Sequence, residues 1–262
     1  MSPAIDDPRA RVDLPAASPR TSEPARERQP AAGISGDDVA VMLLVNLEPR
    51  QALWGFSRLV RGPSALRNQP GLRFAKVLGS GKDAGFGMRP SLTHQGLFTV
   101  FEGEAAADAF MATSDTLRGY RERAIESCVL KLRAYSCRGS WDGRPIRLSA
   151  TAPTEGPISA LTRASILPRK ALEFWRHAPP AQVSLEAAQG CSVAAGLGEA
   201  PLLRQATFSL WDSLQAMDAY ARQGAHQQAI RHSARGQYFS ESMFVRFLPL
   251  AVQGTWKGRR FD

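Results

Sequence analysis

The feature that most constrains the fold of this 262-residue chain is an internal repeat with a period of roughly 110 residues. The two copies align without gaps in three blocks: residues 101–110 with 211–220, 126–132 with 241–247, and 139–141 with 254–256. A period of this length is too long for the repeating unit of a solenoid. The repeat therefore predicts two copies of a small domain in one polypeptide, and a residue present in only one copy is a candidate for function.

The first 36 residues differ in composition from the rest of the chain. They hold six Pro, five Arg and five acidic residues, with almost no large apolar side chain. A segment of this kind buries too little apolar surface to fold by itself, and it lacks the apolar core of a secretory signal. We expect a disordered N-terminal tail over residues 1–36. No stretch of the chain approaches the ~18 apolar residues of a membrane span.

The formal net charge of +9 lies entirely outside this tail, where 28 basic residues face 19 acidic ones. Such a surplus favours contact with anionic lipid headgroups, an acidic protein or nucleic acid. No motif of a nucleic-acid-binding module is present, so we expect no nucleic acid partner. The three cysteines include no Cys-x-x-Cys pair, which argues against a disulfide framework or structural zinc and fits a reducing, cytoplasmic compartment.

Apolar periodicity predicts the same order of elements, β-α-β-β-α-β, in both copies. In the first copy the expected strands are residues 39–47, 74–78, 97–102 and 127–135, and the expected helices are 51–61 and 104–123. In the second copy the strands are 158–166, 191–195, 206–211 and 242–248, and the helices are 170–176 and 213–232. The apolar positions of the first helix are Leu53, Phe56, Leu59 and Val60, and the inward positions of the second are Ala106, Phe110, Leu117 and Tyr120.

This order is that of the ferredoxin-like motif, a four-stranded antiparallel sheet with both helices on one face. The other face of such a sheet is apolar and must be covered. We therefore predict an α+β protein in which two fused ferredoxin-like repeats form a dimeric-type α/β barrel within one chain. The expected boundaries are 37–141 for the first repeat, 142–157 for a linker and 158–256 for the second repeat.

A glycine-rich segment, residues 79–90, joins two strands of the first copy. It lacks the glycine and lysine spacing of a phosphate-binding loop and does not lead from a strand into a helix. The second copy has about seven fewer residues at this point. Because the extra length belongs to one copy only, we take Gly85, Phe86 and Gly87 as a candidate lid or substrate-contacting loop.

The chain has four histidines, His94, His177, His226 and His232, and no pair has metal-ligand spacing. The Gly-x-Ser-x-Gly elbow of a hydrolase is also absent. What remains is chemistry that needs a single histidine, such as axial ligation of haem.

His226 is the first candidate for such a ligand because the aligned position in the first copy holds no histidine. Its neighbours Ala225 and Ala229 are small and would leave room for a flat ring. His232 lies about 240° further round the predicted helix, at ~100° per residue, beside two arginines, so we expect it in solvent. His177 stands at a helix end and His94 in a loop before a strand, and both stay open as alternatives.

Several segments of the chain resemble the spheroidene monooxygenase (acyclic carotenoid 2-ketolase) family. They are residues 73–93, 137–141, 161–166, 174–180, 194–214 and 238–247. The most specific are the glycine-rich segment and the Gly-Leu-Gly-Glu-Ala-Pro run that begins at Gly196. The resemblance covers roughly residues 38–250 and leaves out the tail.

The resemblance implies an enzyme that inserts oxygen at C-2 of acyclic carotenoids such as spheroidene. Two hydroxylations of one carbon give a gem-diol, which loses water to form a 2-keto group. The implied oxidant is O2, the electron donor is reduced ferredoxin and the cofactor is haem. The resemblance does not assign an axial ligand, so His226, with His177 and His94 as alternatives, remains an inference from the residues.

Arg89, Arg204 and Arg222 are candidates to pair with haem propionates, because arginine matches carboxylate geometry. A carotenoid dissolved in a membrane also suggests that the protein is cytoplasmic and contacts the inner or photosynthetic membrane peripherally. Two other functions stay open at this point. One is a haem-degrading or quinone-type monooxygenase on the same fold, and the other is a non-catalytic haem- or carotenoid-binding protein.

Overall fold

The computed structural model describes residues 38–85, 89–177, 185, 187–200, 202–222 and 238–262. Residues 34–262 belong to one compact unit, and the account below concerns that unit alone. Its strands are β1 (Asp38–Leu47), β2 (Leu72–Gly81), β3 (Pro90–Glu102), β4 (Ala124–Gly139), β5 (Ile158–Ile166), β6 (Cys191–Ala200), β7 (Arg204–Trp211), β8 (Phe239–Trp256) and β9 (Arg259–Phe261). Its helices are α1 (Ala52–Arg61), α2 (Glu104–Thr113), α3 (Asp115–Arg121), α4 (Ala171–His177) and α6 (Leu214–Ala221), with short 3-10 turns at Pro49–Gln51, Gly62–Leu66, Lys82–Ala84 and Pro168–Lys170.

Eight of the strands form a closed antiparallel barrel. The strands follow one another in the order β4-β1-β3-β2-β6-β7-β5-β8, and pairing of β8 with β4 closes the ring. The β2–β6 seam is short, with Gly79 opposite Gly198 and Ser80 opposite Leu197. The β4–β8 seam runs from Cys128 opposite Gly254 to Gly139 opposite Met243. We call β1–β4 the first half of the barrel and β5–β8 the second half.

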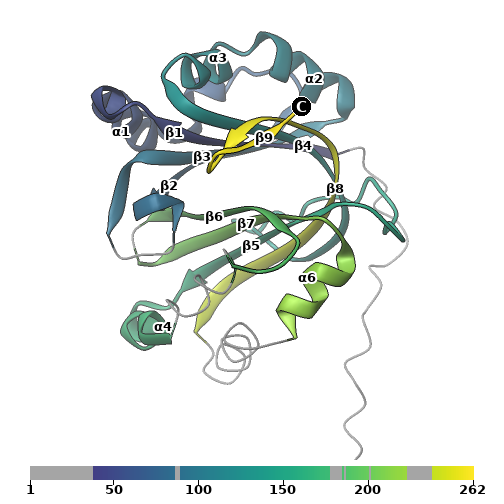
Figure 1. Ribbon diagram of the computed structural model, residues 1–262. Helices are drawn as coiled ribbons and strands as arrows, with labels where there is room; N and C mark the ends of the chain where they lie inside the picture. The colour runs from purple at the N-terminus through teal and green to yellow at the C-terminus, as the bar shows by residue number, and fades with distance from the viewer. Residues whose placement is uncertain (1–37, 86–88, 178–184, 186, 201, 223–237) are drawn as a thin grey trace, which may run out of the picture. The chain divides into compact units, whose positions relative to one another are not determined.

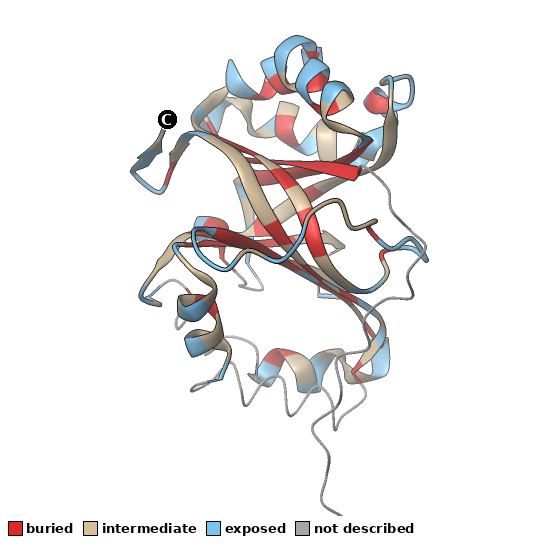
Figure 2. Cartoon of the chain, turned by 90° about the vertical axis from the view of Figure 1, so that its right-hand side faces the viewer, coloured by how far each residue is buried: buried red, intermediate tan, exposed pale blue. Residues whose placement is uncertain are grey.

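The helices cover the outside of the barrel, with α1, α2 and α3 over the first half and α4 and α6 over the second (Figure 1). Buried residues run along the strands between these layers (Figure 2). The barrel interior is filled by side chains from both halves, such as Phe98, Phe208 and Phe247, rather than by an open channel. A second core lies between the first half and its helices, and a smaller one lies under α6.

Two turns of the same design follow β4 and β8. Gly139 and Gly254 have φ of 78° and 107°, and a Cβ at either would lie 2.0 Å from a carbonyl oxygen of the other strand. Only glycine fits such a position. Glu241 accepts hydrogen bonds from the backbone N–H groups of Asp142 and Gly143, and Glu126 accepts them from Lys257 and Gly258 in the same pattern. The matching blocks of sequence therefore form matching local structure.

Two expectations about single elements were wrong. Residues 104–123 form two helices, because Ser114 leaves helical geometry and its Oγ accepts a hydrogen bond from the N–H of Leu117, which starts α3. His94 does not lie in a loop, since β2 and β3 extend into the glycine-rich segment and β3 starts at Pro90. The inward positions Phe110, Leu117 and Tyr120 are buried as expected, and Ala106 packs against the same core.

Candidate functional site

The outer faces of the two halves, which the helices cover, differ at matching positions. In the first half Val77, Leu97, Leu43 and Val129 lie side by side across β2, β3, β1 and β4. In the second half the corresponding row is Gly196, Thr207, Thr162 and Phe244, across β6, β7, β5 and β8. Leu161 points into the barrel core, so alternation along β5 places Thr162 on the outer face.

This row is packed in the first half and open in the second. Leu43 and Leu97 are each 1% exposed and lie in the core under the helices. Thr162, at the centre of its strand, is exposed, and Thr207 and Phe244 are half-buried. The central position of a covered sheet is normally filled by a large apolar side chain, because that is where burial stabilises most. The outer face of the second half is therefore shaped to receive a group other than the described helices.

A cationic side chain stands in the next row of this face. Arg246 of β8 lies opposite Ala160 of β5, which in turn lies opposite Ser209 of β7. Its Nη2 atom is 3.4 Å from the Oδ1 atom of Asp218 on α6. Its buried Nε atom has no hydrogen-bond partner among the described residues. Arg246 thus retains capacity for a further acceptor.

At the matching position in the first half, the positive charge is neutralised more completely. Lys131 binds two carboxylates of α2, Glu104 and Asp108, with both Nζ–O distances at 2.7 Å. These bonds, offset by partial burial, raise the pKa of Lys131. In the aligned blocks Asp218 corresponds to Asp108, whereas Leu214 stands where Glu104 would. Among the residues that the structure describes, Arg246 therefore lacks the second carboxylate that Lys131 has.

Tyr135 of β4 adds a polar group beside Arg246. Its hydroxyl is buried and has no hydrogen-bond partner among the described residues. Burial raises the pKa of Tyr135, while the nearby Arg246 opposes that shift. At neutral pH the hydroxyl is protonated, so it can donate a hydrogen bond. Arg246 and Tyr135 are thus two hydrogen-bond donors that could both serve one anionic group.

The residues predicted from the sequence lie in different places. Arg222 ends α6 and donates to Asp218 over 2.9 Å, so it shares a carboxylate with Arg246. Arg204 is exposed and lies 3.8 Å from Glu199. It is two residues from Ala206, whose side chain faces the barrel interior, so Arg204 is on the same side of β7 and not on the outer face. Arg89 is exposed in the β2–β3 connection of the other half.

Several of the predicted positions fall outside the described residues. These are His226, Phe86 and Gly87, and the side chain of His177, whose backbone ends α4. Gly85 is buried at the edge of the 3-10 turn after β2.

His94 is described and belongs to the first half. Its Nδ1 atom lies 3.0 Å from the Ser91 hydroxyl, and its ring packs edge-on against Trp256 with the centroids 6.0 Å apart. Burial lowers the pKa of His94, so the ring is neutral at pH 7. These contacts indicate that the His94 side chain has a structural role in the wall of the barrel.

Sequence reasoning missed a group of buried charges at one end of the barrel. Arg163, with 1% of its side chain exposed, contacts Glu241, and its Nη2 atom lies 3.7 Å from Asp142 and 3.8 Å from Glu199. Lys76 binds Asp142 and Glu199 as well. Burial raises the pKa of Glu241, but hydrogen bonds from Gly143, Ser140 and Arg163 outweigh it and bring the pKa to about 2. Two cations thus contact three carboxylates, and the Lys76–Glu199 pair connects β2 of the first half with β6 of the second, which indicates a structural role in joining the halves.

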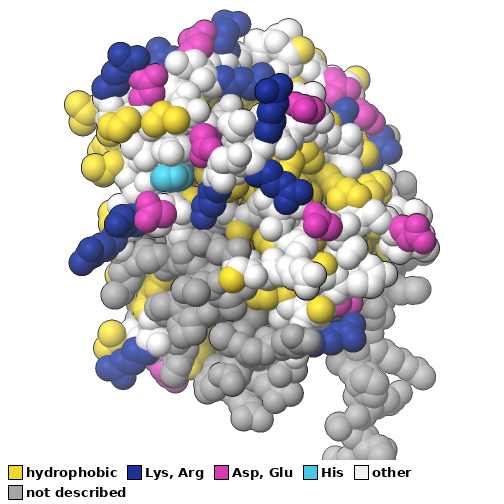
Figure 3. All heavy atoms as spheres, in the orientation of Figure 1, with side chains coloured by type: hydrophobic (Ala, Val, Ile, Leu, Met, Phe, Trp, Pro, Cys, Tyr) yellow, Lys and Arg dark blue, Asp and Glu magenta, His cyan; other side chains and the backbone are white. Residues whose placement is uncertain are grey.

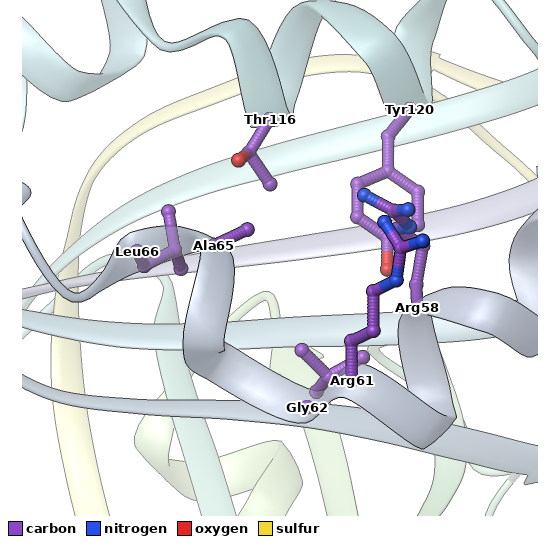
Figure 4. Close-up of a pocket in the computed structure, with 8 residues that line it drawn as sticks. Arg58, Arg61, Gly62, Ala65, Leu66, Thr116 and Tyr120 are labelled. Atoms are coloured by element: carbon purple, nitrogen blue, oxygen red, sulfur yellow. The ribbon is translucent and has the colours of Figure 1, made fainter.

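Two hollows among the described residues are too small for a long polyene. One is a cavity of about 20 Å³ between α1 and α3, bordered by Arg58, Arg61 and Tyr120, with room for about one water molecule (Figure 4). The other, about 340 Å³, is an open groove whose lining includes Arg67, Arg73, Lys76 and Arg144. In the described residues no group of three or more His, Cys, Asp or Glu could hold a metal ion. The described part of the chain also contains no helix long and apolar enough to cross a membrane.

Solved structures share the fold at low sequence identity. An aldoxime dehydratase in complex with butyraldoxime matches with a TM-score of 0.53 and 9% identity, over 81% of this chain and 79% of that chain. A second aldoxime dehydratase structure matches with a TM-score of 0.50 and 11% identity, over 81% of both chains. At these identities the likeness concerns the fold alone.

No family model matches the chain. Curated relatives, however, match it along most of its length. The spheroidene monooxygenase of Rubrivivax gelatinosus is 57% identical over 88% of this chain and 90% of its own length. That of Rhodobacter capsulatus is 33% identical over 84% of this chain and 94% of its own length. Identity at this level over nearly the whole of both proteins shows that the chain belongs to the spheroidene monooxygenase family.

Proposed function

We propose that this protein is a carotenoid monooxygenase that oxidises C-2 of acyclic carotenoids such as spheroidene to a 2-keto group. The observation that carries the proposal is the 57% identity with a spheroidene monooxygenase over 88% of the chain. Each round inserts one atom of O2 into a C–H bond, and two electrons with two protons reduce the other atom to water. A second round at the same carbon gives a gem-diol, which eliminates water.

The proposed cofactor is haem, with reduced ferredoxin as the electron donor. Bound haem would supply the activation of O2 that no amino-acid side chain provides. The described residues fit such a group in two respects. The Gly196–Thr207–Thr162 row has little side-chain volume beside a flat ring, and the Arg246–Tyr135 pair offers donors to a carboxylate.

The residues on the outer face of the second half would then have separate roles. Arg246 and Tyr135 would hold a propionate, with Arg222 close enough to share Asp218. Thr162 and Thr207 would leave room for the plane of the ring, because neither position carries a large side chain. His226 remains the proposed axial ligand, with His177 as the alternative from the same half. The packing of His94 against Trp256 and its bond to Ser91 make it the weakest of the three.

Two finer proposals concern architecture and partners. The strand order β4-β1-β3-β2 in one half and β8-β5-β7-β6 in the other supports two fused ferredoxin-like repeats, over residues 37–141 and 158–256, joined by 142–157. The basic surplus supports docking of an acidic ferredoxin and peripheral contact with an anionic membrane.

The proposed reaction is tested with purified protein supplied with haem, spheroidene, O2 and a ferredoxin reducing system. We expect a product with one additional oxygen and two fewer hydrogens, identified by mass spectrometry. Retention of unchanged spheroidene under these conditions would favour a carrier. Loss of the haem spectrum during turnover, without a carotenoid product, would favour a haem-degrading enzyme.

The proposed haem site is tested separately by optical titration of the apoprotein with haem. Arg246→Gln should weaken haem binding by about tenfold or more, because a charge-assisted hydrogen bond is lost. Lys131→Gln is the matched control at the corresponding position of the first half, and it should leave the titration unchanged. Equal titrations for both variants would remove Arg246 from the site.

A further inference from the structure

Helix α1 has its apolar side chains on the outside. Leu53, Phe56 and Val60 are 86%, 61% and 71% exposed, whereas the buried residue of the helix is Gly55. A Cβ on Gly55 would lie 2.5 Å from a methyl group of Leu47, so the helix sits close to the barrel. The spacing of the three apolar residues places them on one stripe along the helix.

The other sides of α1 already have partners within the protein. Trp54 packs edge-on against Tyr120 of α3, with the ring centroids 5.1 Å apart. Leu59 faces Gly79 of β2. Arg58 points toward Tyr120, and Arg61, which is exposed, lies at the rim of the same small cavity (Figure 4). The helix is therefore anchored through these sides, and the Leu53–Phe56–Val60 stripe is presented outward as a fixed feature of the fold.

The segment of sequence that contains the stripe carries charges of one sign. Between Pro49 and Lys82 the chain has seven basic residues and no acidic one. Arg73 and Lys76 are paired with acids from elsewhere, but Arg61 and Arg67 are exposed. In the space-filling view hydrophobic and basic side chains occur together in the region where Figure 1 places α1, with acidic side chains from other segments beside them (Figure 3).

We propose that α1 docks the protein on an anionic lipid bilayer. Leu53, Phe56 and Val60 would enter the boundary between headgroups and acyl chains, while Arg61 and Arg67 would contact lipid phosphates. An apolar stripe flanked by cations is the design of a helix that lies in the plane of a membrane surface. An acidic protein partner would pair with the basic residues but does not require three exposed apolar side chains, whereas an anionic bilayer surface accounts for both features. This inference rests on the peripheral membrane contact proposed above and assigns that contact to α1. Its test requires no turnover, so its outcome is independent of the proposed reaction.

The test is co-sedimentation of the full chain with vesicles of phosphatidylcholine alone or mixed with phosphatidylglycerol. We expect binding to the mixed vesicles that weakens as salt is raised. The triple variant Leu53→Gln, Phe56→Gln, Val60→Gln should lose about tenfold or more of this binding, since the buried apolar area is removed at constant charge. Arg61→Gln with Arg67→Gln should lose about tenfold or more on the mixed vesicles only.

Ile125→Gln is the matched control, because Ile125 on β4 is 60% exposed and lies outside α1. It should bind vesicles as the wild type does. The fold of each variant is checked by the emission of Trp54 and by thermal unfolding. Equal vesicle binding by wild type and the triple variant would overturn the proposal. A triple variant that changes the sedimentation of the protein from dimer to monomer, without changing vesicle binding, would assign the stripe to a second copy of the chain.

Discussion

Leu43 of β1 and Thr162 of β5 occupy the same place in their halves of the barrel, yet Leu43 is 1% exposed and Thr162 is exposed. Around Leu43 the outer face carries large aliphatic side chains that the helices α1, α2 and α3 bury. Around Thr162 it carries Gly196, Thr207 and Ala160, and Phe244 of β8 is the large side chain of the row. The strand pairing that holds both faces is the same, so the backbone design does not require the small residues. The difference supports the proposal that the first half is specialised for packing and the second for binding.

The largest effect on stability is expected from exchanging these two residues. Leu43→Thr should lower the free energy of unfolding by about 3 kcal/mol, because it leaves a cavity and buries a hydroxyl. Thr162→Leu should change it by less than about 0.5 kcal/mol, since the position is exposed. Urea unfolding of both variants measures the contrast. Equal destabilisation would mean that Thr162 is packed as Leu43 is.

The glutamates of the two matching turns provide the next comparison. Glu241→Gln should cost about 3 kcal/mol at pH 7, because it removes a partner of the buried Arg163. Glu126→Gln should lower the free energy of unfolding by only about 1 kcal/mol, the value of a hydrogen bond. Among its described residues, the first half has no buried arginine for Glu126 to neutralise, because Leu44 occupies the position that corresponds to Arg163.

The pH dependence of the Glu241 effect has a defined direction. The pKa of this carboxyl is about 2 in the folded protein and near 4.5 when unfolded, so its contribution is complete above pH 4.5. The difference between wild type and Glu241→Gln should shrink as the pH falls from 4.5 toward 2. A difference that stays constant over this range would show that the ion pair is not its source.

The smallest effects concern two serines that cap helices. Ser114 accepts a hydrogen bond from Leu117 at the start of α3, and Ser213 accepts one from Ala216 at the start of α6. Ser114→Ala should cost about 1 kcal/mol, the usual value of a lost N-cap. Ser213→Ala should cost less, because α6 buries only Met217 among its residues while α3 buries Leu117 and Tyr120. Thermal unfolding of the two variants compares the helices directly.

The repeat made much of the fold predictable, because the two copies had to satisfy one pattern of strands. It could not predict the face that α1 buries, since Gly55 contributes to close packing without being apolar. The repeat also gave no indication of the candidate site at Arg246. Lys131 and Arg246 align as residues of the same charge, and they differ only in the carboxylates around them. The contrast between Leu43 and Thr162 could have been noticed, but alternation of polar and apolar residues in β5 is equally typical of a strand facing solvent.

The measurement that tests the central claim most directly is a haem titration of the double variant Thr162→Leu, Thr207→Leu. The two substitutions give the second half the residues that Leu43 and Leu97 provide in the first. The control, Thr162→Ser with Thr207→Ser, keeps the face small. We expect the leucine variant to bind haem about tenfold more weakly or not at all, with unchanged urea unfolding, while the serine variant binds as the wild type does. Haem binding by the leucine variant equal to that of the wild type would contradict the assignment of this face as the binding site.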